Sequence, residues 1–403
     1  MQPARRDRQS NLVAGGDLDL GRDPGLGDAC LADTRLEHYL RAWFSELVGS
    51  DVWEYLGAAM RTLRTLKALH REGLLSADPR LAEAADAMAI ALTPEMLALI
   101  DRSDPADPIA RQFVPSVQET EVAPEELPDP IGDDARSPVK GIVHRYPDRV
   151  LLKPLHVCPV YCRFCFRREK VGPGGEALSS AELEAALAYI RSRPEIWEVI
   201  LTGGDPLMLA PRRLADLIAR LDAIPHVGVI RIHSRVPIVD PERVSDDLTN
   251  SLRPQRAALW FAVHCNHARE LGPAARAALA RLADRGIPLM GQTVLLAGIN
   301  DDAETLDELM RALVTARVKP YYLHHPDLVR GTGHFRVTVQ RGQALMKTLR
   351  SRLSGLAQPT YVLDVPGGHG KVPIGPGYLG DDPDALWVED AFGRTHRYPR
   401  EGD

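Results

Sequence analysis

The clearest pattern in the chain lies from residue 150 onward, where short runs of β-branched and aliphatic residues alternate with longer amphipathic stretches. The apolar runs predict strands at 150–155, 198–202, 227–233, 258–263, 289–295, 319–323 and 361–363. The amphipathic stretches between them predict helices at 180–191, 212–222, 243–252, 274–285, 304–316 and 339–353. Right-handed crossovers curl such βα repeats into a barrel, but six repeats are too few for a closed barrel of eight strands. We therefore expect an α/β fold, a partial (β/α)6-type TIM barrel over 150–378, with its site at the carboxyl ends of the strands.

The part of the chain before this barrel has three different patterns. Residues 1–34 are rich in Gly, Asp and Arg and poor in large apolar side chains, which predicts a disordered tail. Residues 35–103 carry apolar residues at helical spacing, which predicts a helical N-terminal region, although Met60 is an alternative start. Residues 104–149 are rich in Pro and acidic residues, which predicts an irregular connection that leads into the site. After the barrel, residues 379–403 are expected to form a short C-terminal tail.

The composition adds few further constraints. The chain has 403 residues, 44% of them apolar and 26% charged, which is typical of a globular protein with a large core. Its net charge of −6 gives no basic footprint for nucleic acid and opposes binding to anionic lipid. No apolar run is long enough for a membrane helix, and the N-terminus lacks the apolar segment of a signal peptide. We expect a cytoplasmic protein with neither nucleic acid nor membrane as a partner.

Candidate chemistry begins with the cysteines. Cys158, Cys162 and Cys165, three of the five in the chain, fall in LHVCPVYCRFCFRR directly after the first predicted strand. Three thiolates, each on one iron, leave the fourth iron of a 4Fe-4S cubane open to another ligand. The spacing resembles that of the radical S-adenosylmethionine superfamily, in which the methionine part of the nucleotide binds that iron. Structural zinc is the alternative, but it needs a fourth ligand, and no cysteine pair follows.

The turn LTGGDPL follows the second predicted strand. Gly203 and Gly204 permit a close approach of the backbone, and Asp205 can accept hydrogen bonds from an ammonium group. These residue types also form ordinary turns, but the position after the second strand favours a binding role. In the superfamily that the cysteines resemble, this turn holds the amine of S-adenosylmethionine.

A third motif, DVPGGHGKVP, places Lys371 in a glycine-rich loop after the last predicted strand. It is not a P-loop, because the required pattern fails at Val365 and Val372. A lysine in such a loop can form a Schiff base if its surroundings keep part of the amine neutral. The alternative for the loop on its own is a solvated lysine.

Taken together and in order, HRYPDRV at 144–150, CPVYCRFCFRR, LTGGDPL, GQTVLLAGIND, PYYLHHPDL and DVPGGHGK closely resemble the lysine 2,3-aminomutase family. The resemblance extends from about residue 104 to about residue 376. It implies three cofactors, namely a 4Fe-4S cluster, S-adenosylmethionine and pyridoxal 5'-phosphate, and an isomerase that moves an amino group between adjacent carbons. In the family the lysine of the last motif carries pyridoxal phosphate, so the resemblance assigns that role to Lys371.

The resemblance also implies roles for residues outside the three motifs. Arg145, Tyr146 and Arg149 match a family segment near the cofactor phosphate and the substrate carboxylate, and arginine suits both anions because its guanidinium can bind in a bidentate way. Positions that contact S-adenosylmethionine in the family are matched here by His264 and Gln292. A family arginine that binds the substrate carboxylate is matched by Arg167.

Substrate choice is assigned by the resemblance to Asp327 and Asp364, which match two acids that bind the distal ammonium of lysine. Two carboxylates favour a cationic substrate, because like charges in a dry pocket repel an acidic one. Lysine conversion to β-lysine is therefore the expected reaction. Arginine is an alternative substrate, and supply of β-lysine for modification of elongation factor P is an alternative role. A non-catalytic iron-sulfur protein is the alternative from a different class.

The expected partners are an amino acid substrate and an electron donor such as flavodoxin or ferredoxin. The best-known family members carry a cysteine-rich, zinc-binding C-terminal tail, whereas no cysteine follows Cys265 here. Contact between subunits through such a tail is therefore not expected, and the question of a homo-oligomer stays open.

Overall fold

The computed structural model describes residues 61–76, 78–173, 175, 177–382 and 385–399. The chain divides into two units between Leu56 and Gly57, and everything that follows concerns the second unit. The tail expected over 1–34 and the helices expected before residue 61 lie outside the described residues.

A sheet of nine strands forms the centre of the fold, with the strands side by side in chain order. Its strands are β1 Ile142–Tyr146, β2 Arg149–Leu155, β3 Glu198–Gly203, β4 Val229–Ser234, β5 Ala258–His264, β6 Leu289–Val294, β7 Val318–His324, β8 Thr360–Val365 and β9 Gly370–Pro373. Strands β2 to β8 are parallel, while β1 and β9 pair antiparallel at the two ends of the order. The predicted partial (β/α) barrel is confirmed, and all seven of its predicted strands are present. The two antiparallel end strands were not predicted.

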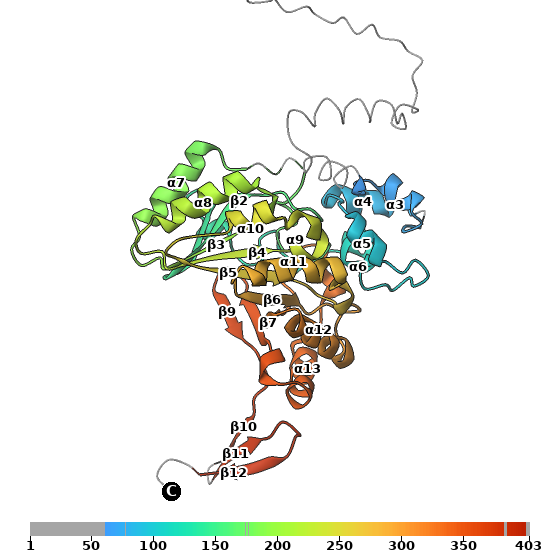
Figure 1. Cartoon of the computed structure of the whole chain (residues 1–403). Coiled ribbons are helices and arrows are strands. Elements are labelled where there is room, and N and C mark those ends of the chain that lie inside the picture. The colour runs from blue at the N-terminus through green and yellow to red at the C-terminus, as the bar shows by residue number, and fades with distance from the viewer. Residues whose placement is uncertain (1–60, 77, 174, 176, 383–384, 400–403) are drawn as a thin grey trace, which may run out of the picture. The chain divides into compact units, whose positions relative to one another are not determined.

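Helices follow the parallel strands and lie along the sheet (Figure 1). The α-helices are α7 Ser180–Arg191, α8 Pro211–Asp222, α9 Val236–Val239, α10 Asp246–Ser251, α11 Pro273–Asp284, α12 Ala303–Thr315 and α13 Val339–Arg352. Short 3-10 helices are η1 Val117–Thr120, η2 Asp134–Arg136, η3 Pro206–Met208, η4 Pro241–Arg243, η5 Ala268–Glu270, η6 Gly333–Phe335 and η7 Gly355–Ala357. The six predicted helices are all present, and α9 is an unpredicted single turn after β4.

Local sequence explains why these helices start and pack where they do. Helix α7 starts at a capping box in which Ser179 and Glu182 satisfy each other's backbone N–H groups. Helix α8 buries an apolar stripe of Leu214, Leu217 and Leu221, spaced three and four residues apart. This stripe joins the main hydrophobic core between helices and sheet. The outer layer thereby fixes the strands whose carboxyl ends carry the motifs.

The region before the barrel packs onto it. Its helices are α3 Leu66–Arg71, α4 Arg80–Ala87, α5 Pro94–Leu99 and α6 Ala110–Phe113. The hydroxyl of Thr93 donates a hydrogen bond to the carbonyl oxygen of Val239 at 2.6 Å, across to the turn after β4. Residues 104–141 have little regular structure, but Ile109 and Phe113 are fully buried in the main core. The segment is therefore anchored in the core, and its Ile131 lines the cavity described below.

The last described residues form a second sheet, which was not predicted where a short tail was expected. Strands β10 Leu379–Asp382, β11 Ala385–Glu389 and β12 Thr395–Tyr398 pair antiparallel in chain order. The ammonium of Lys347 on α13 lies 2.7 Å from a carboxylate oxygen of Glu389 on β11. Among the helices of the described residues, none has the length and apolar character needed to span a bilayer.

Candidate active site

A cavity of about 880 Å³ occupies the inside of the partial barrel. It extends from the cysteine loop at the carboxyl ends of the strands to residues near their amino ends, such as Glu198 and Trp260. Of the residues that the sequence pointed to, Gly203 is the one that does not line it. The fold therefore brings together, in one cavity, side chains from segments more than 200 residues apart.

The loop that follows β2 carries the three cysteines, whose thiols are free and half-buried in the cavity wall. Arg163, a fully buried residue of this loop, anchors it to the N-terminal region. Its guanidinium lies 2.6 Å from a carboxylate oxygen of Glu119 and donates to the backbone carbonyl oxygens of Ala84 and Met88 at 3.1 and 3.2 Å. The N-terminal region thus holds the cysteine loop in place through a paired buried charge.

The donor set of this loop suits an iron-sulfur cluster. Within the described residues, no three His, Cys, Asp or Glu side chains converge on a point where a single metal ion would be held. A cubane differs from a single ion because each thiolate binds a different iron. Burial raises the pKa of the Cys165 thiol to about 11, and iron must displace that proton when it binds.

The turn after β3 packs directly against the cysteine loop. Gly203 has a φ of 116°, and a Cβ at Gly204 would lie 2.4 Å from the carbonyl oxygen of Val157, so both positions require glycine. The Asp205 carboxylate accepts hydrogen bonds from the Ser234 hydroxyl at 2.8 Å and from the backbone N–H of Arg235 at 2.7 Å. These bonds tie the turn to the end of β4. The carboxylate of Asp205 is therefore held by the protein, and Gly204 and Asp205 both line the cavity.

The two residues proposed to contact S-adenosylmethionine are neighbours across the sheet. His264 on β5 and Gln292 on β6 are register partners, and both line the cavity. The Nε2 atom of His264 lies 3.2 Å from Oδ1 of Asn266, and the imidazole packs edge-on against Phe164 from the cysteine loop. Burial holds the pKa of His264 well below its usual value, so the ring is neutral at pH 7. This wall connects β5 and β6 to the cysteine loop.

At another side of the cavity, Lys371 lies on β9 opposite Asp364 on β8, and the two are register partners in the antiparallel pair. The ammonium of Lys371 is 2.5 Å from a carboxylate oxygen of Asp364. The hydroxyl of Tyr146 on β1 accepts a hydrogen bond from the backbone N–H of Lys371 at 2.6 Å. The lysine and its acid therefore face the cavity from a hairpin that is fastened to the opposite end strand of the sheet.

The second acid, Asp327, follows β7 and also lines the cavity. Burial, and then the nearby charge of Asp364, raise the pKa of Asp327 to about 7, while Lys371 opposes this shift. The two acids therefore influence each other, and the lysine ammonium acts on both. Arg145 reaches the same group, because its Nη1 lies 3.4 Å from a carboxylate oxygen of Asp364.

Known protein families and individual relatives match this chain over the segments that form the cavity. The radical SAM superfamily profile matches residues 152–254, and the profile described as lysine-2,3-aminomutase matches residues 346–385. The L-lysine 2,3-aminomutase of Fusobacterium nucleatum is 42% identical over 73% of this chain and 69% of its own length. The chain belongs to the lysine 2,3-aminomutase family. It is an isomerase of the aminomutase type, and the radical SAM family implies a 4Fe-4S cluster and S-adenosylmethionine.

Other relatives agree in part. The L-lysine 2,3-aminomutase of Clostridium subterminale is 41% identical over 74% of this chain and 71% of its own length. The glutamate 2,3-aminomutase of Clostridioides difficile is 38% identical over 72% of this chain and 68% of its own length. Among solved structures, the crystal structure of Streptococcus suis SuiB bound to S-adenosylmethionine has a TM-score of 0.41, with 11% identity over 54% of this chain and 51% of that chain. That last likeness is too weak to add to the family assignment.

One acid of this aminomutase site was missed by the sequence analysis. Asp133 is almost fully buried and accepts hydrogen bonds from Nη2 of Arg145 at 3.1 Å and from Nε of Arg167 at 2.9 Å, and the ammonium of Lys153 lies 3.9 Å away. It thereby positions both arginines that were predicted to bind carboxylate. The only signal was the acid-rich turn PDPIGDD, which does not show which acid is buried.

A second missed group lies near the amino ends of the strands. Arg231 on β4 lies 3.0 Å from a carboxylate oxygen of Glu198, and the hydroxyl of Tyr321 donates to that of Tyr322 at 2.9 Å. Beside them lie Arg149 and Tyr146, which the sequence analysis had indicated, with the guanidinium stacked 3.7 Å from the ring centroid. These side chains come from β1 to β7. They add two arginine–carboxylate pairs, Arg231 with Glu198 and Arg149 with Asp148, and tyrosine hydroxyls to the cavity lining.

The aminomutase cavity offers what pyridoxal phosphate needs. Lys371 supplies an amine, and cationic side chains and tyrosine hydroxyls surround it. Two buried polar atoms, Nε of Arg145 and Nε2 of His233, have no hydrogen-bond partner within the described protein. Buried polar groups are normally satisfied, so atoms of this kind in a cavity wall indicate a polar ligand. The residues present therefore fit the group.

Proposed function

We propose that this enzyme is an L-lysine 2,3-aminomutase, which moves the α-amino group of lysine to the β-carbon and releases β-lysine. It would use a 4Fe-4S cluster on Cys158, Cys162 and Cys165, S-adenosylmethionine at that cluster, and pyridoxal phosphate on Lys371. The proposal is supported by the names of the relatives and by a cavity that joins the cysteine loop to the Lys371 hairpin.

The observation that carries the choice of substrate is the pair of acids around an alkylammonium. The side chain of Lys371 ends in the same chemical group as the side chain of the substrate lysine. In this structure that ammonium binds Asp364 and lowers the pKa of Asp327 against the effect of burial. If Lys371 is engaged by the cofactor, its ammonium leaves these acids. They are then available to bind the distal ammonium of the substrate through charge-assisted hydrogen bonds.

Overall identity does not decide the substrate, because relatives named for lysine and for glutamate match this chain almost equally well. The two acids support lysine over glutamate in this proposal. A substrate carboxylate placed beside Asp364 and Asp327 would bring a third negative charge into a poorly hydrated space, where like charges repel strongly. Arginine carries a cation but is longer, and it serves as the informative competitor in the test.

Each group in the cavity has a task that follows from its contacts. When bound, pyridoxal phosphate supplies a carbonyl that bonds the amino group and a ring that spreads an unpaired electron, and S-adenosylmethionine supplies the carbon radical that starts the reaction. Arg145 and Arg167, held by Asp133, present guanidinium groups to the substrate carboxylate. Arg149 and Tyr146 provide a cation and a hydroxyl for the cofactor phosphate. The protein's contribution is orientation, which lowers the entropic part of the barrier.

The proposed cluster also implies a cellular compartment and an electron donor for the enzyme. Thiolates that hold iron require a reducing compartment, so we propose a cytoplasmic location. One electron must reach the cluster, and a small acidic or iron-sulfur carrier such as flavodoxin or ferredoxin is the proposed donor.

The experiment compares amino acids with the full-length protein, purified and reconstituted without oxygen with iron, sulfide, pyridoxal phosphate and S-adenosylmethionine. Lysine, arginine and glutamate are each incubated with a chemical reductant, and the β-amino isomers are separated from their α-isomers by chromatography after derivatisation. We expect turnover of lysine and none of glutamate. Faster turnover of arginine than of lysine would replace the proposed substrate, and absence of iron from the reconstituted protein would contradict the proposal altogether.

A further inference from the structure

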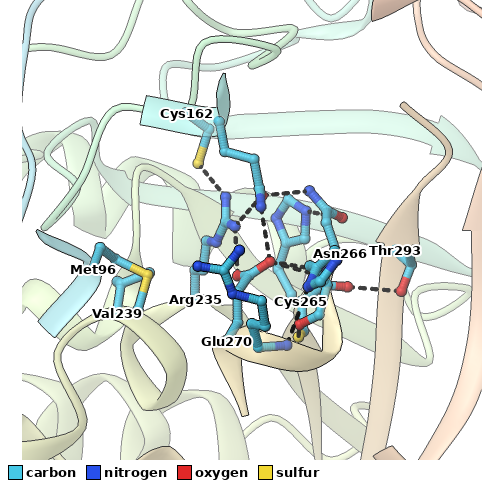
Figure 2. Close-up of polar contacts among 12 residues, drawn as sticks. Met96, Cys162, Arg235, Val239, Cys265, Asn266, Glu270 and Thr293 are labelled. Atoms are coloured by element: carbon cyan, nitrogen blue, oxygen red, sulfur yellow. Dashed lines mark hydrogen bonds and ion pairs between the residues drawn. The ribbon is translucent and has the colours of Figure 1, made fainter. Parts of the chain in front are cut away.

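Arg235, the first residue after β4, reaches the sulfur of a cluster cysteine. Its Nη1 donates a hydrogen bond to Sγ of Cys162 at 2.8 Å (Figure 2). Among the hydrogen bonds in the described part of the chain, this is the one that joins a charged side chain to a cysteine of the CPVYCRFC loop. Neither the cysteine spacing nor any other motif in the sequence indicated it, because the two residues are 73 positions apart.

The guanidinium lies in an environment that does not screen its charge. Arg235 is 5% exposed, and its Cζ lies 4.7 Å from the ring centroid of Phe113 and 5.6 Å from that of Phe164. Aromatic faces attract a cation, and burial lowers the effective dielectric constant, which strengthens the electrostatic effect of the group on a neighbouring sulfur. The charge therefore acts on Cys162 at short range.

Two residues from other segments, Gln112 and Glu270, bind the guanidinium and hold it in this place. Nη2 of Arg235 donates to Oε1 of Gln112 at 2.6 Å and to Oε2 of Glu270 at 2.7 Å. Glu270, on η5, is itself fixed, because its Oε1 accepts from Nε2 of Gln112 at 3.0 Å and from the backbone N–H of Asn266 at 3.0 Å (Figure 2). The network is buried, and each of these named groups has a partner. The guanidinium of Arg235 therefore contacts the sulfur of Cys162 with one nitrogen and the carboxylate of Glu270 with another.

We propose that Arg235 raises the reduction potential of the cluster held by this loop, and that Glu270 sets how far. Reduction adds an electron whose density extends onto the ligand sulfurs. A cationic N–H donor at the sulfur of Cys162 stabilises that density and favours the reduced state, as hydrogen bonds to cluster sulfurs generally do. The buried carboxylate of Glu270 cancels part of this charge. This inference rests on the cluster assigned to the three cysteines under the proposed function.

The proposal predicts opposite effects for the two partners. Arg235→Met removes the donor and the cation and keeps an apolar side chain between the rings, so it makes reduction harder. Glu270→Gln removes the opposing negative charge and keeps a side chain of similar shape, so it makes reduction easier. A generally damaged site would not give opposite signs. Arg235→Lys, which keeps the charge on a shorter donor, should change the potential in the same direction as Arg235→Met but by less.

The measurement is a potentiometric titration of the reconstituted full-length protein, followed by the electron paramagnetic resonance signal of the reduced cluster, with neither nucleotide nor substrate added. At the midpoint potential of the unchanged protein, Arg235→Met should lower the ratio of reduced to oxidised cluster at least about tenfold, which is about 59 mV for one electron. Glu270→Gln should raise that ratio. Catalytic turnover is not needed for this readout.

The matched control is Arg168→Met. Like Arg235→Met it removes a buried arginine near the cysteines, but this arginine lies at the end of the cysteine loop itself. Its guanidinium binds Glu119 and the carbonyl oxygen of Gly331, not a sulfur. Its shift should be smaller than that of Arg235→Met. If Arg235→Met binds no iron, Arg235→Lys and Glu270→Gln decide the matter through their opposite signs.

The experiment distinguishes failure of the proposed function from failure of this inference alone. Failure of the unchanged protein to bind an iron-sulfur cluster would overturn the proposed function and the inference with it. An intact cluster whose midpoint is unchanged in the Arg235 variants, or that shifts in the same direction in Glu270→Gln and Arg235→Lys, would overturn the inference alone.

Discussion

The two charged regions of the cavity are built in opposite ways. Beside the cysteine loop, Arg163 and Arg235 have fixed partners, namely buried carboxylates and backbone carbonyls. On the hairpin side, the partly exposed Lys371 pairs with the buried Asp364, and Asp327 has a pKa raised to about 7. Paired buried charges resist change, because breaking a pair leaves a charge without compensation. The charges beside the cysteine loop are therefore fixed by their partners, whereas those on the hairpin side must exchange partners when ligands bind.

The largest effect should come from removing the amine of the hairpin side. Lys371→Ala should lower kcat by about 10³-fold or more, in the range found when a covalently acting group is lost. The visible absorbance of the cluster should remain, because the cysteine loop has its own anchors. Lys347→Ala, which breaks an ion pair with Glu389 away from the cavity, is the control and should retain activity. Full activity of the Lys371 variant would remove the basis for the proposed chemistry.

The next effect tests Asp133, the acid that compensates Arg145 and Arg167. Asp133→Asn should lower the free energy of unfolding by about 3 kcal/mol, because it leaves buried cations without their carboxylate. Urea unfolding of the cluster-free protein measures this change. The adjacent Asp134 is exposed and pairs with Lys170, so Asp134→Asn should change the stability by less than about 1 kcal/mol. Equal changes in the free energy of unfolding would mean that the buried pairs of Asp133 contribute no more to stability than the exposed pair of Asp134.

A smaller effect concerns the binding of the substrate cation by Asp327. Because burial and Asp364 raise the pKa of Asp327 to about 7, the group is mostly protonated below that pH and cannot form an ion pair. The KM for lysine should therefore fall as the pH rises through about 7. Asp327→Asn should raise KM by about 10- to 100-fold, the loss expected for a charge-assisted hydrogen bond, and should flatten that part of the pH profile. A KM independent of pH in the unchanged enzyme would argue against this role.

The smallest effect should come from the C-terminal sheet, which contributes no residue to the cavity lining. Glu389→Gln removes the partly exposed ion pair with Lys347 and should change the stability by less than about 1 kcal/mol. Neither kcat nor KM should change. Steady-state kinetics and thermal melting check this, and a loss of turnover would show that the sheet reaches the site.

The strands and helices of the barrel could be predicted because the pattern that specifies each of them lies within its own consecutive residues. The seven parallel strands and six main helices follow from apolar periodicity, and local capping residues fix ends such as that of α7. Strand β1, IVHRY, was missed because its two apolar residues are consecutive and do not alternate with polar ones, and β9, GKVP, because it is four residues long and begins in a glycine-rich loop. Both form only when the sheet supplies a partner edge, which is a tertiary effect.

The site was predictable to the extent that its residues lie in motifs. The cysteines and Lys371 stand in compact patterns, whereas Arg235, Glu270 and Gln112 come from segments that have no pattern of their own. Their meaning arises from contacts between residues up to 158 positions apart. A single sequence contains no record of such contacts. Asp205 shows a further limit, because its motif predicted a binding role but not that its carboxylate also ties the turn to the end of β4.

The register of the β8–β9 hairpin has a consequence for how the enzyme can diverge. Asp364 and Lys371 oppose each other across a turn of fixed length. Because successive side chains alternate between faces, adding or deleting one residue in that turn would rotate one of the two away from the cavity while the other stayed. Single-residue changes in the length of this turn would therefore separate the pair, whereas exchange of side chains within the loop keeps its register.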